Sequence, residues 1–272
     1  MTSSLSYPEF QKLIWDYHAA NRRSLPWRET HDPYRIMVSE LMLQQTQVAR
    51  VIDKYAAFLA AFPTVKELAA APVADVLRLW QGLGYNRRAL NLQRAAKMVA
   101  EELGGNFPQS PAELQALPGI GPYTAGAIAA FAYNRPVTFI ETNIRRVYLH
   151  FFFPDQEGIG DKELLPIIEA TVSPENPREW YYALMDYGAN LPKVIANPNR
   201  RSKHYAVQSK FEGSNRQVRG GILRELAAHE GMSAASLTES LGLEYSRVAA
   251  ALEALRSEGF LQDDEGTYRL SA

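Results

Sequence analysis

Two glutamates in this sequence have surroundings that suit acid–base chemistry, and the first is Glu40. It lies among apolar residues, with Met37 and Val38 before it and Leu41 and Met42 after it. A carboxyl group in such surroundings is poorly solvated, so we expect its pKa to be raised. A carboxyl that stays protonated near neutral pH can donate a proton to a leaving group. A solvated glutamate on a helix surface is the alternative, and on these residues alone it is the commoner case.

The second glutamate, Glu141, follows the apolar run 137–140 and precedes a predicted helix over 144–153. At a helix N-terminus the macrodipole favours the ionised form of a carboxylate, so we expect Glu141 to stay charged. Asn143 is a residue type that caps helices. Glu40 and Glu141 would therefore provide one proton donor and one negative charge. Acidic residues at helix N-termini also occur for stability alone.

A ten-residue segment, 117–126, reads LPGIGPYTAG and lies between two predicted helices. The glycines Gly119 and Gly121 allow backbone N–H groups to face outward beside a helix N-terminus. Such a turn binds a phosphate without reading base sequence. An ordinary helix–helix turn is the alternative, because Pro and Gly punctuate many of them.

The composition limits the class of protein. The 272 residues are 46% hydrophobic and 22% charged, which is typical of one large globular domain or two unequal ones. The net charge of -1 means that nucleic-acid binding must rest on local basic clusters. The absence of cysteine excludes disulfides, thiolate catalysis, and cysteine-bound zinc or iron–sulfur clusters. Without a leader pattern or a long apolar run, we expect a cytoplasmic protein with no membrane partner.

Two basic stretches are candidates for phosphate contacts. The stretch 78–97 contains five Lys/Arg and no acid, with Arg87 and Arg88 at its centre. Between residues 193 and 219 there are seven Lys/Arg and one acid, and this includes Arg200, Arg201 and Lys203. The second stretch is either a solvated linker or a strap that contacts a phosphate backbone.

Helical periodicity and Gly/Pro punctuation predict an all-α body up to about residue 190. Residues 36–62 predict one or two long helices, and capping-box patterns begin at Thr64 and Ser110. After a basic linker over 191–215, a small unit over 216–272 is predicted. Its expected elements are helices over 216–229, 233–240 and 244–258, followed by a hairpin around 263–266. These elements suggest a winged helix-turn-helix, but the third helix is not basic, so docking is as plausible as DNA reading.

Together, several segments resemble the HhH-GPD superfamily of DNA glycosylases, which includes endonuclease III and the MutY-type adenine glycosylases. Besides the hairpin 117–126, the matching segments are LPWR at 25–28, DPY at 32–34, SELMLQQTQV at 39–48 and WQGLGY at 80–85. The resemblance covers about residues 8–190. It implies a helix-hairpin-helix glycosylase domain of two helical subdomains over 1–190.

The resemblance also implies roles for the candidate residues. Glu40 would protonate the base, and Glu141 would stabilise the sugar cation at a position where the family carries an aspartate; Asn143 matches a family asparagine. Tyr123 stands where bifunctional relatives carry a Schiff-base lysine, and tyrosine cannot form an imine, so a monofunctional enzyme is expected. Gln44 and Gln45 would enter the duplex when the base is extruded.

The same resemblance sets the expected partners. The substrate would be double-stranded DNA with adenine opposite guanine or 8-oxoguanine, hydrolysed by a monomer. A thymine, uracil or other damaged-base glycosylase is the first alternative, and a non-catalytic DNA-binding or regulatory protein is the second. The four-cysteine iron–sulfur loop of the family is replaced by the basic strap, so no cluster is expected, whereas a monovalent cation at the hairpin stays possible. The family's C-terminal domain that inspects 8-oxoguanine is replaced by the winged-helix unit.

Overall fold

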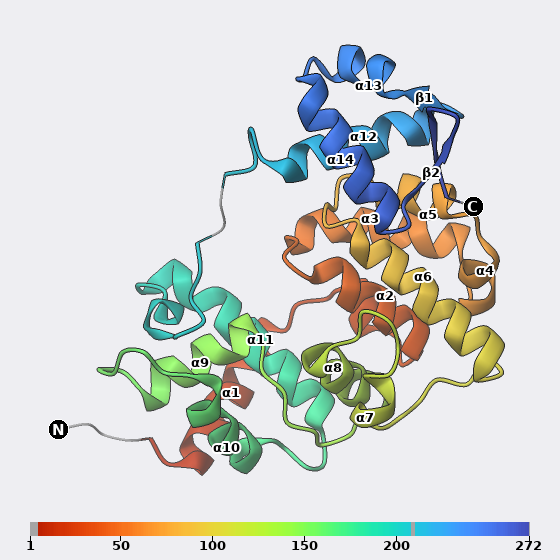
Figure 1. Ribbon diagram of the computed structural model, residues 1–272. Coiled ribbons are helices and arrows are strands. Elements are labelled where there is room, and N and C mark those ends of the chain that lie inside the picture. Colours follow the sequence, from red (N-terminus) through yellow and green to blue (C-terminus); the bar gives the residue numbers. More distant parts are fainter. Residues whose placement is uncertain (1–4, 208–209, 272) are drawn as a thin grey trace. The chain divides into compact units, whose positions relative to one another are not determined.

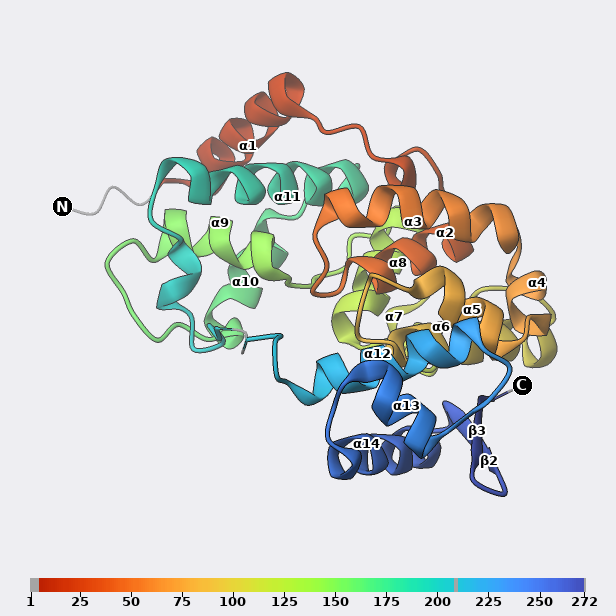
Figure 2. The same ribbon diagram turned by 90° about the horizontal axis from the view of Figure 1, so that it is seen from above.

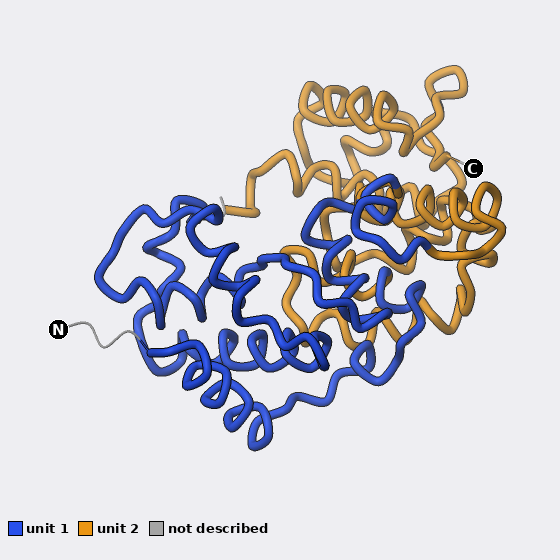
Figure 3. Tube along the Cα trace, turned by 90° about the horizontal axis from the view of Figure 1, so that it is seen from below, with its two compact units in different colours: residues 1–37, 108–116, 120–207 blue, residues 38–107, 117–119, 208–272 orange. Residues whose placement is uncertain are grey.

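The computed structural model describes residues 5–207 and 210–271, and this part of the chain is mainly helical (Figure 1). The chain divides into two compact units that exchange segments (Figure 3). Unit 1 comprises residues 1–37, 108–116 and 120–207. Unit 2 comprises residues 38–107, 117–119 and 208–272. Helix α2 (Pro33–Leu43) begins in unit 1 and continues into unit 2.

Unit 1 is built from helices only in its described residues. In chain order they are α1 (Tyr7–Asn21), η1 (Pro26–Arg28), the start of α2, α7 (Pro111–Leu114), α8 (Pro122–Tyr133), α9 (Thr142–Phe152), α10 (Asp161–Thr171), α11 (Pro177–Val194) and η3 (Pro198–Arg201). Phe10 of α1 is fully buried, with its ring centroid 5.3 Å from that of Tyr148 and 5.9 Å from that of Trp180. This aromatic cluster holds α1, α9 and α11 together.

Unit 2 joins a helical part to a small C-terminal lobe. Its elements are the end of α2, α3 (Val48–Ala61), α4 (Val65–Ala70), α5 (Val73–Trp80), α6 (Arg87–Lys97), η2 (Met98–Glu102), α12 (Asn215–Ala228), β1 (Met232–Ser233), α13 (Ala234–Leu241), α14 (Tyr245–Ser257), β2 (Leu261–Asp264) and β3 (Thr267–Leu270). The strands form an antiparallel sheet in the order β1-β3-β2. Helix α12 packs against α5, as both ribbon views show (Figures 1 and 2).

The sequence predictions of the fold are largely confirmed. Residues 36–62 form two helices, α2 and α3. Both predicted capping boxes are formed, with Thr64 and Ser110 accepting the backbone N–H groups of Glu67 and Glu113. The three C-terminal helices and the hairpin lie within two residues of their predicted positions. Strand β1 was not predicted, because two residues carry no alternating pattern.

The predicted strap over 191–215 differs most from its expectation. Helix α11 extends through its first residues to Val194, and η3 follows at Pro198–Arg201. The compact units also cut across the predicted domain boundaries, because residues 38–107 group with the C-terminal lobe. In the residues that the structure describes, none of the helices combines the length and apolar character that crossing a bilayer requires.

Candidate functional site

Glu40 lies on α2 and is only 4% exposed. Met37 and Leu41 on the same helix are 0% and 1% exposed, so the predicted burial of this carboxyl group is confirmed. Burying a carboxylate costs free energy unless other groups compensate for the lost water. A glutamate is seldom buried in a protein interior, so its burial here marks the position as a candidate for chemistry.

Glu141 is the N-cap residue of α9, as its position before the predicted helix suggested. Its Oε1 atom accepts hydrogen bonds from the backbone N–H groups of Asn143 and Ile144, at 2.6 and 2.8 Å. The Asn143 side chain donates to Oε2 at 3.2 Å. Burial nevertheless raises the pKa of Glu141 above its ordinary value, against the lowering by these donors and by Arg146. Desolvation therefore outweighs the helix terminus and the hydrogen-bond donors in setting the direction of this pKa shift.

Arg146 fixes the orientation of the Asn143 side chain. Its Nη1 atom donates to Asn143 Oδ1 at 2.8 Å and to the Gly188 carbonyl at 2.5 Å. Its Nε atom donates to Asn197 Oδ1 at 3.0 Å. Because Asn143 Oδ1 is engaged by a guanidinium, the amide nitrogen faces Glu141. No sequence motif marks Arg146 or Asn197 for this role, because it depends on the packing of α9 against α11 and η3.

Gly188 permits that packing. A Cβ atom at this position would lie 2.4 Å from the carbonyl oxygen of Asn143, far inside contact distance. Helices α9 and α11 therefore approach each other closely at Asn143, two residues after the Glu141 N-cap, and only glycine at position 188 allows this.

Two residues of the strap form hydrogen bonds with the backbone of α9 and so stabilise that helix. Asn199 Nδ2 donates to the Thr142 carbonyl at 2.9 Å, and Arg201 donates to the carbonyls of Leu149 and Pro154 at the other end of α9. The prediction that Arg201 contacts phosphate is corrected, because C-terminal helix carbonyls attract its guanidinium.

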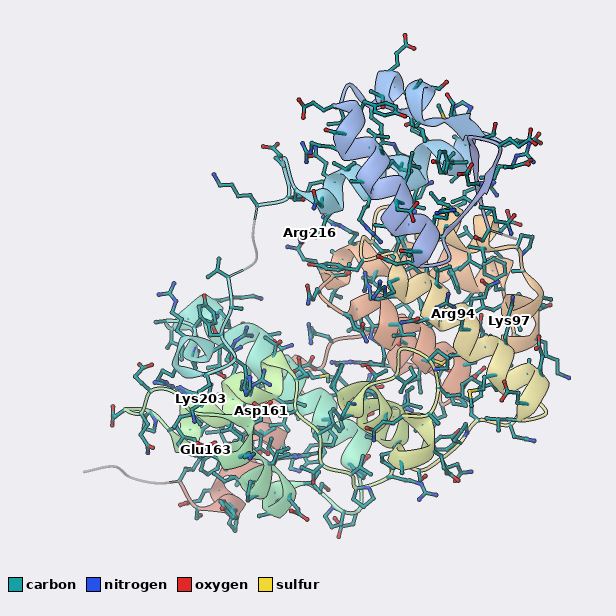
Figure 4. All side chains as sticks on the ribbon, in the orientation of Figure 1. Arg94, Lys97, Asp161, Glu163, Lys203 and Arg216 are labelled. Atoms are coloured by element: carbon teal, nitrogen blue, oxygen red, sulfur yellow. The ribbon has the colours of Figure 1, made fainter. Side chains whose placement is uncertain are left out.

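The other two strap residues predicted to contact phosphate, Arg200 and Lys203, are exposed. Lys203 pairs with Glu163 at 3.6 Å, beside Asp161 (Figure 4). Arg200 is exposed. Of the three basic residues predicted to contact phosphate, Arg200 therefore stays the best candidate.

The turn after α2 carries the two glutamines. Gln45 is exposed and has a left-handed φ of 52°. A residue with a side chain adopts this conformation at a cost of about 1 kcal/mol or more, so the surrounding structure must hold it. The backbone carbonyl of Gln44 accepts from Arg88 Nη1 at 2.6 Å. The buried Arg88 thus stabilises the Gln44–Gln45 turn through a hydrogen bond to its backbone.

Arg88 is a buried cation that binds backbone carbonyl groups. It is 8% exposed, and burial lowers its pKa to about 10, which leaves it protonated at neutral pH. Its Nη atoms donate within 3.2 Å to the carbonyls of Leu41 and Met42 at the end of α2. They also donate within 3.2 Å to acceptors in two loops, which are the carbonyls of Gln44, Leu83 and Gly84, and Thr46 Oγ1. The prediction that Arg88 contacts phosphate is therefore corrected; it terminates α2 and joins the 83–85 loop to the glutamine turn.

We expect Arg88→Met to lower the free energy of unfolding by about 3–5 kcal/mol, because several buried carbonyls would lose their donor at about 1–3 kcal/mol each. Urea unfolding measures this. Arg50→Met, at an exposed arginine of α3, is the control and should stay within about 0.5 kcal/mol of the parent. Equal stability of the two variants would contradict this role of Arg88.

Arg87, the second predicted phosphate contact in this stretch, forms an ion pair with another residue of the chain. Its Nη2 atom lies 2.9 Å from Glu258 Oε2 of the C-terminal lobe. Arg94 of the same stretch donates to the Glu258 carbonyl at 3.5 Å. Arg87 therefore has an acidic partner distant in the sequence, while its side chain is 64% exposed, and its contact with phosphate stays a prediction.

The hairpin glycines are both exposed. Gly119 has φ +78°, and a Cβ atom there would lie 2.6 Å from Asn91 Cβ, so two independent constraints require glycine. Gly121 is the N-cap of α8. Tyr123, in the first turn of α8, is half-buried, with its ring centroid 5.9 Å from that of Phe139. The hairpin therefore presents open backbone at a helix N-terminus, as phosphate binding needs.

The candidate residues form distinct local groups. Unit 1 brings together Glu141, Asn143 and Arg146, whereas Glu40 and the glutamine turn belong to unit 2. Within residues 5–207 and 210–271, no group of three or more His, Asp or Glu side chains is arranged to hold a metal ion.

Comparison with known proteins gives consistent matches. The family model described as "HhH-GPD superfamily base excision DNA repair protein" matches residues 38–169. The adenine DNA glycosylase of Mycolicibacterium smegmatis is 35% identical over 236 residues, which cover 80% of each chain. That of Buchnera aphidicola subsp. Baizongia pistaciae is 38% identical over 193 residues, which cover 70% of this chain and 54% of that protein. A thermostable thymine-DNA glycosylase of known structure is 25% identical, with a TM-score of 0.62, covering 72% of this chain and 89% of that one. The chain spans about half the length, or less, of several curated relatives.

Proposed function

We propose that this chain, which belongs to the HhH-GPD superfamily of base excision DNA repair proteins, is a monofunctional DNA glycosylase that removes adenine from double-stranded DNA. The opposing base would be guanine or 8-oxoguanine, and the protein would act as a monomer. The observation that carries the proposal is the pair of carboxyl groups in different environments, a buried Glu40 and an N-capping Glu141.

The proposed reaction divides the work between these two groups. Glu40 would donate its proton to a ring nitrogen of the extruded adenine, so that the base leaves with the glycosidic electron pair. The Glu141 carboxylate would stabilise the positive charge that develops on the sugar. Water would then add to the anomeric carbon and return a proton to Glu40. Because Tyr123 cannot form an imine, the product would be an intact abasic strand.

No cofactor is part of the proposed chemistry. Residues 117–122 of the hairpin carry no side-chain oxygen. A monovalent cation there would be held by backbone carbonyl oxygens, and would assist only the contact with phosphate.

The proposal is tested on a panel of duplexes with single mismatches or oxidised bases, treated with alkali after incubation to cleave abasic sites. Cleavage at adenine opposite guanine or 8-oxoguanine, and none before alkali, supports it. Cleavage at thymine or uracil instead would favour a thymine or uracil glycosylase, an alternative that the similarity to the thymine-DNA glycosylase supports. Binding without cleavage of any duplex would favour a non-catalytic protein.

The strap gives a separate prediction about binding. We expect Arg200→Gln to weaken binding to all duplexes and to reduce the slope of log K against log salt by about 1, with unchanged thermal stability. Arg201→Gln should instead lower stability by about 1–2 kcal/mol, because α9 loses a C-terminal donor. Salt titrations and melting curves of both variants check this, and a salt slope that Arg200→Gln leaves unchanged would argue against the contact.

A further inference from the structure

The C-terminal lobe, residues 215–270, is bound to the helical part of unit 2 by polar contacts. Glu258 accepts two hydrogen bonds from Arg219, at 2.9 and 2.7 Å, besides its ion pair with Arg87. Arg78 of α5 donates to the Ala227 carbonyl at 3.3 and 3.2 Å. Arg78 and Arg87, both of the basic stretch 78–97, attach the lobe to α5 and α6, whereas the contact between Arg219 and Glu258 lies within the lobe.

The charge of the lobe does not suit DNA. Its hairpin carries Asp263, Asp264 and Glu265, all exposed. In a winged helix-turn-helix that reads DNA, this hairpin and the third helix would approach phosphates, which acidic side chains repel. The charge of the hairpin therefore does not favour a direct contact with phosphates.

One contact of the lobe reaches a strained residue. Arg216, in the first turn of α12, is labelled in Figure 4. It donates from Nη1 to the Tyr85 hydroxyl at 2.9 Å, and its guanidinium carbon lies 5.8 Å from the centroid of the Tyr85 ring. The Arg88 guanidinium lies 5.6 Å from the same centroid. Tyr85 has a left-handed φ of 49° and is 38% exposed. Two arginine side chains thus contact the Tyr85 ring, and Tyr85 has a backbone conformation that residues with a side chain disfavour.

The loop of Tyr85 is joined to the glutamine turn. Arg88 donates to the carbonyls of Gly84 and Tyr85 as well as to that of Gln44. Thr46 Oγ1, beyond the glutamines, lies 3.4 Å from the Leu83 carbonyl. A change at Tyr85 would therefore be transmitted to Gln44 through one buried arginine.

We propose that Arg216 is a positioning residue, through which the C-terminal lobe holds Tyr85 and the joined Gln44–Gln45 turn in the conformation that engages a duplex. The inference rests on the proposed function, because that function places the turn in DNA. The lobe then contributes to DNA engagement without contacting DNA itself.

The test is a double-mutant cycle in the full chain. Arg216→Gln removes the cation, Tyr85→Phe removes only the hydroxyl, and a third variant carries both changes. Arg224→Gln is the matched control, since Arg224 lies on the same helix, is 63% exposed on its side chain and pairs with Glu225. The measurements are the melting midpoint, the Kd for a duplex, the single-turnover excision rate, and the fluorescence of 2-aminopurine beside the mismatch, which reports unstacking.

We expect each single variant to lose about tenfold in base unstacking and excision, with Arg224→Gln unchanged. The double variant should lose no more than the single ones, because both changes break the same contact. Additive losses, with a reduced salt slope for Arg216→Gln, would mean that Arg216 binds phosphate directly and would overturn the proposal. Wild-type behaviour of Tyr85→Phe would also overturn it, even if Arg216→Gln folds poorly. Unstacking is measured without excision, so a protein that cleaves no duplex would refute the proposed function and still leave this coupling measurable.

Discussion

Glu40→Gln is expected to bind a mismatched duplex as tightly as the parent and to excise the base about 10²–10⁴-fold more slowly. The substitution keeps the size of the side chain and most of its hydrogen-bonding capacity, but removes the proton that the leaving base requires. Single-turnover kinetics with saturating enzyme separate this effect from binding, because the rate is then that of the bound complex.

The matched control for this variant is Glu169→Gln, which makes the same chemical change at an exposed position of α10. It should leave both binding and excision unchanged. If Glu40→Gln behaved like this control, Glu40 would not be the proton donor, whatever its burial.

Glu141→Gln should be similarly damaging, because it removes the negative charge that faces the developing cation while a Gln oxygen can still accept from the backbone of α9. Loss of one preorganised electrostatic partner costs about 10²–10³ in rate. Duplex binding and the melting midpoint should be retained. If the Glu40 and Glu141 variants both excised at the parental rate, the catalytic assignment would be wrong.

The pKa of Glu141 sets the sign of the pH dependence. Burial raises this pKa, so the carboxylate becomes protonated at a higher pH than an exposed glutamate would. Because the proposed role needs the ionised form, excision should fall as pH decreases through that raised pKa. In Glu141→Gln this acidic limb should disappear from the rate–pH profile, and its persistence would assign the limb to another group.

Glu141→Asp is the informative companion, because it restores the residue that the family carries at this position. Aspartate is a good N-cap but its carboxylate is one methylene nearer the backbone. Excision at or above the parental rate would show that the site accepts either length. A large loss would show that the surroundings, including Asn143 and Arg146, are fitted to glutamate.

Some of the candidate site could be predicted because its signals are local. Apolar neighbours along α2 indicated that Glu40 would be buried, and the residues before α9 indicated the N-cap at Glu141. Gly119 belongs to a turn motif that its own sequence specifies. In each case the relevant physics acts within one helix or one turn.

The arginines could not be assigned in this way, because the sequence shows a charge without its partner. Arg88 and Arg201 lie in basic stretches that favour phosphate contacts, yet several of their acceptors are carbonyls 44 to 52 residues distant in the sequence. The partner of Arg87 is Glu258, in a lobe at the other end of the chain. A basic cluster predicts an anionic or carbonyl partner, and only the tertiary structure shows whether the protein itself supplies it.

Unit 1 is built from segments that are far apart in the sequence, and this affects how the chain can fold. Arg28, beside α1, binds Asp186 of α11 across 158 residues of sequence, at 2.9 Å on both carboxylate oxygens. During synthesis α1 is made before α9 and α11. The apolar face of α1 therefore stays exposed until α9 and α11 have been made and can pack against it. Long-range closure of this kind slows folding and prolongs the exposure of apolar surface. Helix α1 thus leaves the ribosome well before it can reach its final contacts with α9 and α11.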